Sequence, residues 1–288
     1  MVRRYQAGQY REKPMTDYDP LAALSDIHAK RGYLLPHHGL MAISTPNLLE
    51  RYDSLYSTLA LTERHLSRHA HEFVWLGVLI SCEESLGSHH VKRFVDAGGD
   101  AAHLGLATAI SAMAKGSEGY LFVEDHWVPH LPTTNPREQY LAAFAQVIGP
   151  VAPALAHMTA CAVHTCSGNW RALKWQIEAA YQAGVNELEL AEALSLAMFP
   201  GSVPYYVRAA EVWRQLIVEG AVQASDLFKQ WAEISGQGGY DEASGVKKGM
   251  TLSSHPSFAE TENLEKSLCL ELLLQESLNS HLRCAMRR

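Results

Sequence analysis

Acidic and histidine side chains are concentrated in one stretch of the sequence. Glu83 and His90 are seven residues apart, which is two turns of a continuous helix, so the spacing predicts a carboxylate and an imidazole on one helix face. An imidazole with a pKa near neutrality suits a general acid or base, and a carboxylate beside it would orient its ring. Glu84 and His89 form the alternative pair, and a helix break at Gly87 would change both spacings.

Glu72 lies near the start of an apolar helix and is a further candidate. If its carboxyl group is buried, its pKa will be raised, as in many general bases. Each candidate also has a purely structural interpretation. Glu72 would then be an exposed first-turn acid, Glu83 and Glu84 a solvated acidic helix start, and His90 a hydrogen-bonded core histidine.

Basic and aromatic residues near these candidates are predicted to bind a substrate. Arg93, Lys92 and Lys115 could hold a substrate carboxylate, although surface solvation explains each of them equally well. Trp175 and Tyr205 are predicted to form core or pocket wall.

Histidine and cysteine spacing indicates neither a metal site nor a disulfide framework. His65 and His69 have the four-residue spacing of helical zinc ligands, but no zinc signature is completed, and no metal is predicted. The five cysteines lack regular spacing. Cys161 and Cys166 are five residues apart, on different faces of a helix, which favours structural thiols.

Composition excludes several classes of protein. The chain has 288 residues, 47% hydrophobic and 19% charged, with a net charge of −7. No basic stretch is typical of a nucleic-acid binder, and no apolar run reaches the ~20 residues that cross a bilayer. No signal sequence is recognisable, so we expect a cytoplasmic protein without a nucleic-acid or membrane partner.

Apolar spacing, capping residues and glycine stops predict an all-α fold. Asp19-Pro20 and Thr45-Pro46 each open a helix, Asp100 caps another, and residues 82–87 form a hinge. His37-His38 is assigned to a loop. Residues 120–136 are expected to be a connector, and further helices are expected over 137–148, 151–167, 169–183, 187–199, 203–219 and 226–234.

The chain contains an internal repeat. Ala97-Gly98 matches Ala183-Gly184 at an offset of 86 residues, and Gly116-Ser117 matches Gly201-Ser202 at an offset of 85. Duplication explains this better than convergence of two helix–turn–helix units. The predicted organisation is therefore an N-terminal arm, two repeats, and a linker with a C-terminal tail, over residues 1–44, 45–130, 137–234 and 235–288.

The first repeat resembles a known superfamily. Cys82-Glu83-Glu84, then Ser88-His89-His90-Val91, then Ala97-Gly98 and a capped helix resemble carboxymuconolactone decarboxylase and alkylhydroperoxidase D proteins. The resemblance implies tandem helical units, with Glu72 as the leading glutamate and His90 as the family histidine. The cysteine pair of the peroxidase branch falls on Glu83 and Leu86, so that pair is absent.

The resemblance implies a cofactor-independent lyase that acts on a small carboxylated lactone or aromatic-derived compound. His90 would be the proton donor, Glu83 or Glu84 would tune it, and Glu72 would be a second acid or base. The second repeat has Trp175 and Gln176 at the positions of His89 and His90, so the chemistry is assigned to the first repeat.

The same resemblance leaves two alternatives and predicts an assembly. A thiol peroxidase would need a reactive thiolate and a resolving partner, and Cys82 has no partner in the sequence pattern. A helical repeat protein without catalytic activity is the third possibility. The family packs its units into oligomers, so we expect a homo-oligomer, most simply a dimer or trimer.

Overall fold

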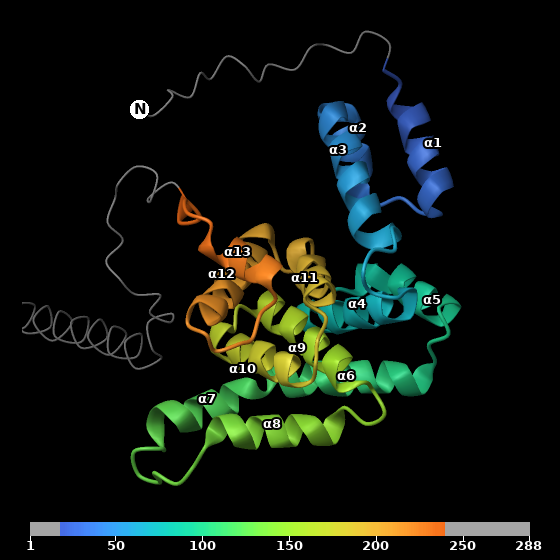
Figure 1. The fold of residues 1–288 in the computed structure, drawn as a ribbon. Helices are drawn as coiled ribbons and strands as arrows, with labels where there is room; N and C mark the ends of the chain where they lie inside the picture. The colour runs from blue at the N-terminus through green and yellow to red at the C-terminus, as the bar shows by residue number, and fades with distance from the viewer. Residues whose placement is uncertain (1–17, 240–288) are drawn as a thin grey trace, which may run out of the picture. The chain divides into compact units, whose positions relative to one another are not determined.

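The computed structural model describes residues 18–239, and these residues form helices without any strand (Figure 1). In chain order the α-helices are α1 Pro20–Arg31, α2 Pro36–Ser44, α3 Pro46–Tyr56, α4 Arg68–Cys82, α5 Ser88–Asp96, α6 Ala101–Lys115, α7 Ser117–His126, α8 Pro136–Val147, α9 Pro153–Ser167, α10 Trp170–Gln182, α11 Glu187–Ser195, α12 Val203–Val218 and α13 Asp226–Glu233. The predicted all-α class is confirmed. Residues 1–17 of the predicted N-terminal arm and residues 240–288 of the predicted linker and tail lie outside the described residues.

Local capping explains where several helices begin and end. The Asp19 carboxylate accepts a hydrogen bond from the Leu21 amide at 2.9 Å, and the Asp100 carboxylate accepts one from the His103 amide at 2.9 Å. Gly32 ends α1 with a φ of 80°, in the left-handed region that glycine adopts without strain. These boundaries agree with the sequence prediction.

Two predicted loops are wrong. His37 and His38 lie in α2, where Pro36 is the first helical residue and the His38 Nδ1 accepts a hydrogen bond from the Leu35 amide at 3.0 Å. The predicted connector over 120–136 overlaps α7, which runs to His126. The prolines that break the helical pattern begin only at Pro129, so the sequence before them is free to continue as helix to His126.

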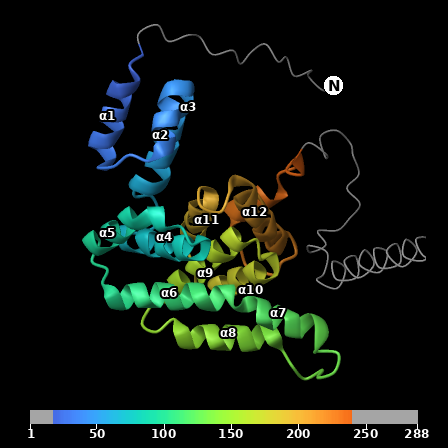
Figure 2. The same cartoon turned by 180° about the vertical axis from the view of Figure 1, so that it is seen from behind.

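Helices α4 and α9 cross closely inside the fold. Helix α9 packs against α4, α6, α10 and α11. A Cβ at Gly77 would lie 2.5 Å from the Thr159 Cγ2, so glycine is what allows α4 to approach α9 this closely. Figure 1 and Figure 2 both show α6 running beside α8 along one side of this unit.

The predicted repeats share their hydrophobic cores. One core contains Trp75 and Val78 of the first repeat with Leu173 of the second, and the other contains Phe73 and Phe94 with residues of α8 and α9. Helices α1 to α3 bury a small separate cluster of Ile27, Ala42 and Leu49. The compact unit ends at Ile234, where the tail was predicted to begin.

Candidate active site

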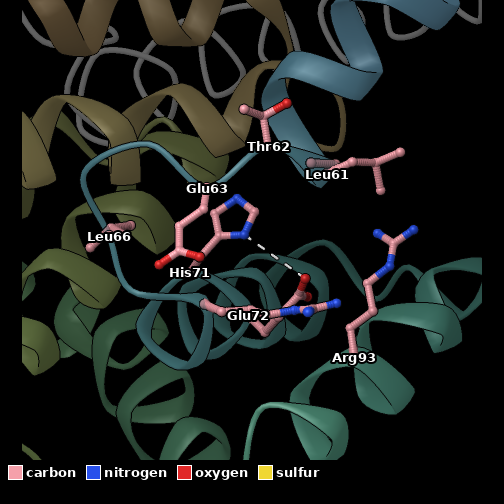
Figure 3. Close-up of a pocket in the computed structure, with 9 residues that line it drawn as sticks. Leu61, Thr62, Glu63, Leu66, His71, Glu72 and Arg93 are labelled. Atoms are coloured by element: carbon pink, nitrogen blue, oxygen red, sulfur yellow. Dashed lines mark ion pairs between the residues drawn. The ribbon is translucent and has the colours of Figure 1, made fainter.

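A small cavity opens between α4, α5 and the segment that leads into α4 (Figure 3). Its volume is about 140 Å³, enough for several waters or a small organic group and well below the size of a drug-binding pocket. Its walls combine apolar side chains with two carboxylates, an imidazole and two guanidinium groups. The lining residues are Ala60, Leu61, Thr62, Glu63, Leu66, Arg68, His71, Glu72 and Arg93.

Glu72 is the buried acid of this cavity. Ser67 caps α4 by accepting a hydrogen bond from the Ala70 amide, and the next turns of the helix are buried almost all round. Glu72 is therefore only 2% exposed although it is charged in water. Burial raises the pKa of Glu72 to about 7, against the opposing effect of His71, Arg93 and Arg68. A carboxyl group with this pKa gains and loses a proton near neutral pH.

His90 lies behind Glu72, away from the cavity lining. Its Nδ1 is 2.7 Å from the Glu72 Oε2, and its ring stacks on Trp75 with 4.3 Å between centroids. Burial and the Arg93 cation lower the pKa of His90, so the imidazole is neutral and its Nδ1–H donates to the Glu72 carboxylate. His90 therefore positions Glu72 and holds its charged form in place.

His71 contacts the other oxygen of Glu72. Its Nε2 donates to the Leu59 carbonyl at 3.1 Å, which leaves Nδ1 unprotonated and 3.8 Å from the Glu72 Oε1. Burial lowers the pKa of His71, so this imidazole is also neutral. His71 was not among the predicted catalytic residues, because nothing in the sequence spacing shows that it faces a cavity.

Arg93 presents an unsatisfied donor at this site. Its Nη1 is buried and makes no hydrogen bond within the described residues. Figure 3 shows its side chain reaching from α5 towards Leu61 and the cavity. A buried guanidinium nitrogen without a partner is energetically costly, and a carboxylate entering the cavity would supply its acceptor. The prediction that Arg93 faces a substrate is therefore compatible with its position, and Arg68 adds a second cation.

Glu83 and Glu84 do not join this site. Helix α4 ends at Cys82, Glu83 takes a left-handed conformation with φ 55°, and α5 begins at Ser88. The continuous helix that would have paired Glu83 with His90 is therefore absent, and that pairing is wrong. Glu83 is exposed beside Lys115, and the Glu84 carboxylate accepts a hydrogen bond from the Leu86 amide.

The other predicted substrate contacts also lie elsewhere. Lys92 forms an exposed ion pair with Asp96, and Lys115 forms one with Glu83. Trp175 is buried in the core. Tyr205 is 36% exposed and packs edge-on against a neighbouring indole. None of these four residues lines the cavity, so they cannot hold a ligand bound there.

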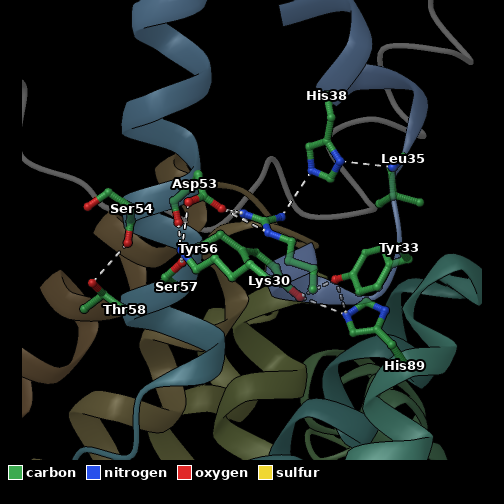
Figure 4. Close-up of polar contacts among 11 residues, drawn as sticks. Lys30, Tyr33, Leu35, His38, Asp53, Ser54, Tyr56, Ser57, Thr58 and His89 are labelled. Carbon is green, nitrogen blue, oxygen red and sulfur yellow. Dashed lines mark hydrogen bonds and ion pairs between the residues drawn. The ribbon is translucent and has the colours of Figure 1, made fainter. Parts of the chain in front are cut away.

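His89 connects this region to the N-terminal helices (Figure 4). Its Nε2 lies 2.8 Å from the Tyr56 hydroxyl and 3.1 Å from the Tyr33 hydroxyl. Burial and the neighbouring His90 and Arg93 lower the pKa of His89 to about 3, so its neutral ring accepts one hydrogen bond at Nε2, while the two hydroxyls also bond each other at 3.0 Å. The sequence did not indicate these contacts, because they are long-range. Tyr56 is separated from His89 by 33 positions, and Tyr33 is separated from His89 by 56 positions.

Arg31 holds the Tyr56 ring in position to contact His89. Its guanidinium bonds the Asp53 Oδ1 through two nitrogens, at 2.6 and 3.1 Å, and lies 4.2 Å from the centre of the Tyr56 ring. This arrangement fixes α1 against α3 and keeps the Tyr56 hydroxyl within hydrogen-bonding distance of His89.

Helices α9 and α10 hold a neutral pair that resembles the Glu72–His90 pair of α4 and α5. Glu72 and His157 are each the fifth residue of a 15-residue helix. The His157 Nδ1 lies 2.6 Å from the Gln176 Oε1, and the Gln176 amide donates to the Tyr140 hydroxyl at 2.8 Å. Burial lowers the pKa of His157, so neither partner carries a charge. The position in α9 that corresponds to Glu72 in α4 therefore has a histidine in place of a carboxylate.

No family model, curated protein or solved structure matches this chain. Among residues 18–239, no helix is both long and apolar enough to cross a bilayer. Within the same residues, no three histidine, cysteine or acidic side chains are placed to share a metal ion.

Proposed function

We propose that this chain is an enzyme that transfers a proton to or from a small carboxylated molecule, with Glu72 as the general acid and base. The observation that carries the proposal is a buried carboxyl group with a pKa of about 7 in the wall of a small cavity. Structural carboxylates are normally exposed or paired with a cation, whereas burial against a neutral imidazole favours proton exchange at neutral pH.

The cavity supplies the remaining groups for such a reaction. Arg93 and Arg68 would bind the carboxylate of the substrate, and the apolar side chains Leu61 and Leu66 would pack against its ring. His90 would donate its Nδ1–H to Glu72 and keep the carboxyl group aimed into the cavity. This assigns proton transfer to Glu72 and a positioning role to His90, in place of the donor role that the sequence suggested.

The resemblance to carboxymuconolactone decarboxylases suggests the reaction class. Loss of carbon dioxide from a carboxylated unsaturated lactone leaves an electron pair that is delocalised into the ring. Protonated Glu72 would then deliver its proton to carbon and would be regenerated from water after product release. We therefore propose a cofactor-independent lyase of this superfamily.

Two further features belong to the same proposal. The matched helix positions of Glu72 and His157, and the matched pairs they form, support duplication of one helical unit in which only the first copy retained the acid. A cytoplasmic homo-oligomer, most simply a dimer or trimer, follows from the resemblance to proteins that assemble from such units.

The proposal is tested by release of carbon dioxide from small carboxylated lactones. We expect the wild-type chain to turn over at least one such compound, and Glu72→Gln to lower kcat by a factor of about 100 or more, the usual contribution of a general acid or base. Glu83→Gln is the matched control, because Glu83 is an exposed acid at the end of the same helix, and it should keep activity within about twofold.

Two results would contradict the proposal. One is turnover by Glu72→Gln at the wild-type rate. The other is a complete lack of turnover and of binding for carboxylated ring compounds, which would favour a helical protein without catalytic activity.

A further inference from the structure

A buried acid of α11 holds one wall of the cavity. Residues 62–67, the wall segment, lead into α4 and supply part of the cavity lining. Glu192 is 2% exposed, and its Oε2 accepts hydrogen bonds from the His65 amide at 2.7 Å and from the Leu66 amide at 3.0 Å. One carboxylate oxygen therefore binds two consecutive amides of the wall segment, from a position 126 residues beyond Leu66.

The other oxygen of Glu192 faces two basic side chains. Its Oε1 lies 3.6 Å from the Arg64 Nε and 4.0 Å from the His71 Nε2. Arg64 also donates through its Nη2 to the Ser195 hydroxyl at 3.3 Å, which adds a side-chain link between the wall segment and α11. The opposite ring nitrogen of His71 is 3.8 Å from the Glu72 Oε1. Glu192 therefore contacts both the wall segment and the histidine beside Glu72.

The corresponding place in α6 shows that packing here does not require an acid. Glu192 and Leu106 are each the sixth residue of their helix. A Cβ at Gly149, in the segment that leads into α9, would lie 2.9 Å from the Leu106 Cδ2. An apolar side chain thus packs against the segment before α9, whereas a carboxylate binds the segment before α4, the helix that carries Glu72.

The wall segment and Glu72 line the same cavity. Figure 3 shows the wall segment curving from Thr62 past Leu66 into the helix that carries Glu72. Burial is the largest cause of the raised pKa of Glu72, so water that enters past a loosened wall would return this pKa towards its ordinary value. The other charged or titratable groups around Glu72 and Glu192 are Glu63, Arg64, Arg68, His71, His90 and Arg93.

We propose that Glu192 is a positioning residue of the candidate site, which binds the wall segment to α11 and so keeps bulk water away from Glu72. The catalytic role of Glu72 rests on the proposed function, whereas the hold on the wall segment rests on the contacts of Glu192 itself. Glu192 lies behind the lining residues, so it acts through the wall segment and His71 and exchanges no proton with a substrate. Helices α4 and α5 carry the acid and its partner, and α11 completes their site.

Two substitutions separate the acceptor from the charge. Glu192→Gln keeps a side-chain oxygen that can accept from both amides, whereas Glu192→Leu places in α11 the residue type found at the sixth position of α6 and removes the acceptor. Hydrogen exchange measured by NMR reports on the His65 and Leu66 amides. We expect both to exchange about tenfold to a hundredfold faster in Glu192→Leu, because each loses a hydrogen bond to a charged group, and to change by no more than about threefold in Glu192→Gln. Glu189→Leu, one turn earlier in α11, is the matched control and should leave both amides protected.

The pKa of Glu72 supplies a readout that a loss of packing elsewhere would not change. Carbon-13 NMR of the Glu72 carboxyl group, identified by the signal that is absent from Glu72→Gln, measures this pKa. Both Glu192 variants lose the same negative charge, and only Glu192→Leu also admits water. We therefore expect the pKa of Glu72 to be about one unit lower in Glu192→Leu than in Glu192→Gln.

A measurement on the wild-type chain guards against variants that fail to fold. The His65 and Leu66 amides should exchange at least about tenfold more slowly than the Glu63 and Arg64 amides, which donate no hydrogen bond within residues 18–239. Equal exchange at all four amides would overturn the proposal.

Two results from the variants would also overturn it. One is full protection of the His65 and Leu66 amides in Glu192→Leu, and the other is an equal pKa of Glu72 in the two Glu192 variants. A wild-type pKa of Glu72 near 4.5 would instead contradict the proposed function, and the exchange rates alone would then decide whether Glu192 holds the wall segment.

Discussion

Replacing Glu72 with glutamine should stabilise the protein at alkaline pH. The pKa of Glu72 is raised from 4.5 to about 7, so the folded state holds a proton that the unfolded chain has already lost between these values. Stability from this group is therefore fully present below about pH 4.5 and is lost as the pH rises through about 7. At about 1.4 kcal/mol for each pKa unit, the loss amounts to about 3 kcal/mol.

Glutamine removes this loss and keeps the hydrogen bond. Its side-chain oxygen can accept the His90 Nδ1–H, as the Gln176 Oε1 of α10 accepts from the His157 Nδ1 of α9 at 2.6 Å. Because the histidines titrate in both proteins, their contributions cancel in the difference between wild type and variant. The stability advantage of Glu72→Gln should grow by about 2 kcal/mol between pH 5 and pH 8.

Urea unfolding followed by far-ultraviolet circular dichroism measures this difference at several pH values. Glu83→Gln is the control, and its stability difference from wild type should stay flat, because Glu83 is exposed. A flat difference for Glu72→Gln, or a wild type that is the more stable protein at pH 8, would refute an ionisation at this buried position.

Four other outcomes are expected. His90→Phe should move the pH-dependent loss of stability to higher pH by about one unit, because the Glu72 carboxylate loses a donor, and an unchanged midpoint would refute the positioning role. Gly99→Ala should lower the free energy of unfolding by about 1–3 kcal/mol, because its Cβ would lie 2.3 Å from the Phe94 ring. Gly105 lies on the exposed face of α6, in the middle of the helix, and an added Cβ would meet nothing within 4 Å. Gly105→Ala should therefore raise the free energy of unfolding by about 0.5–1 kcal/mol. Denaturant melts that show Gly99→Ala as the more stable of the two variants would contradict both predictions. A chain ending at residue 239 should keep its melting transition, since the compact unit ends at Ile234, and a loss of cooperativity would contradict this.

The helices were largely predictable because their signals are local. Asp19, Asp100 and Gly32 act within one or two turns, and their capping follows from their own chemistry. Helix α2 was missed because a Pro-His-His-Gly sequence resembles a loop, although proline is well suited to the first helical position.

The site was predictable as a set of residues but not as an arrangement. Glu72 and His90 were both candidates, yet their contact spans 18 positions and depends on how α5 folds back onto α4. The seven-residue spacing of Glu83 and His90 was misleading because Glu83 leaves the helix in a left-handed conformation.

The neutral His157–Gln176 pair has a consequence for the proposed duplication, in which Glu72 is the proposed catalytic group. In an assembly of single units, every copy would bury an ionisable carboxyl group and would lose about 3 kcal/mol of stability above neutral pH. A chain with two linked units needs that acid only once, and the other unit keeps the same hydrogen-bond geometry with groups that stay uncharged. On the proposed duplication, the His157–Gln176 pair of the second half loses no stability at alkaline pH. The stability of the second half therefore allows the first half to retain a buried acid.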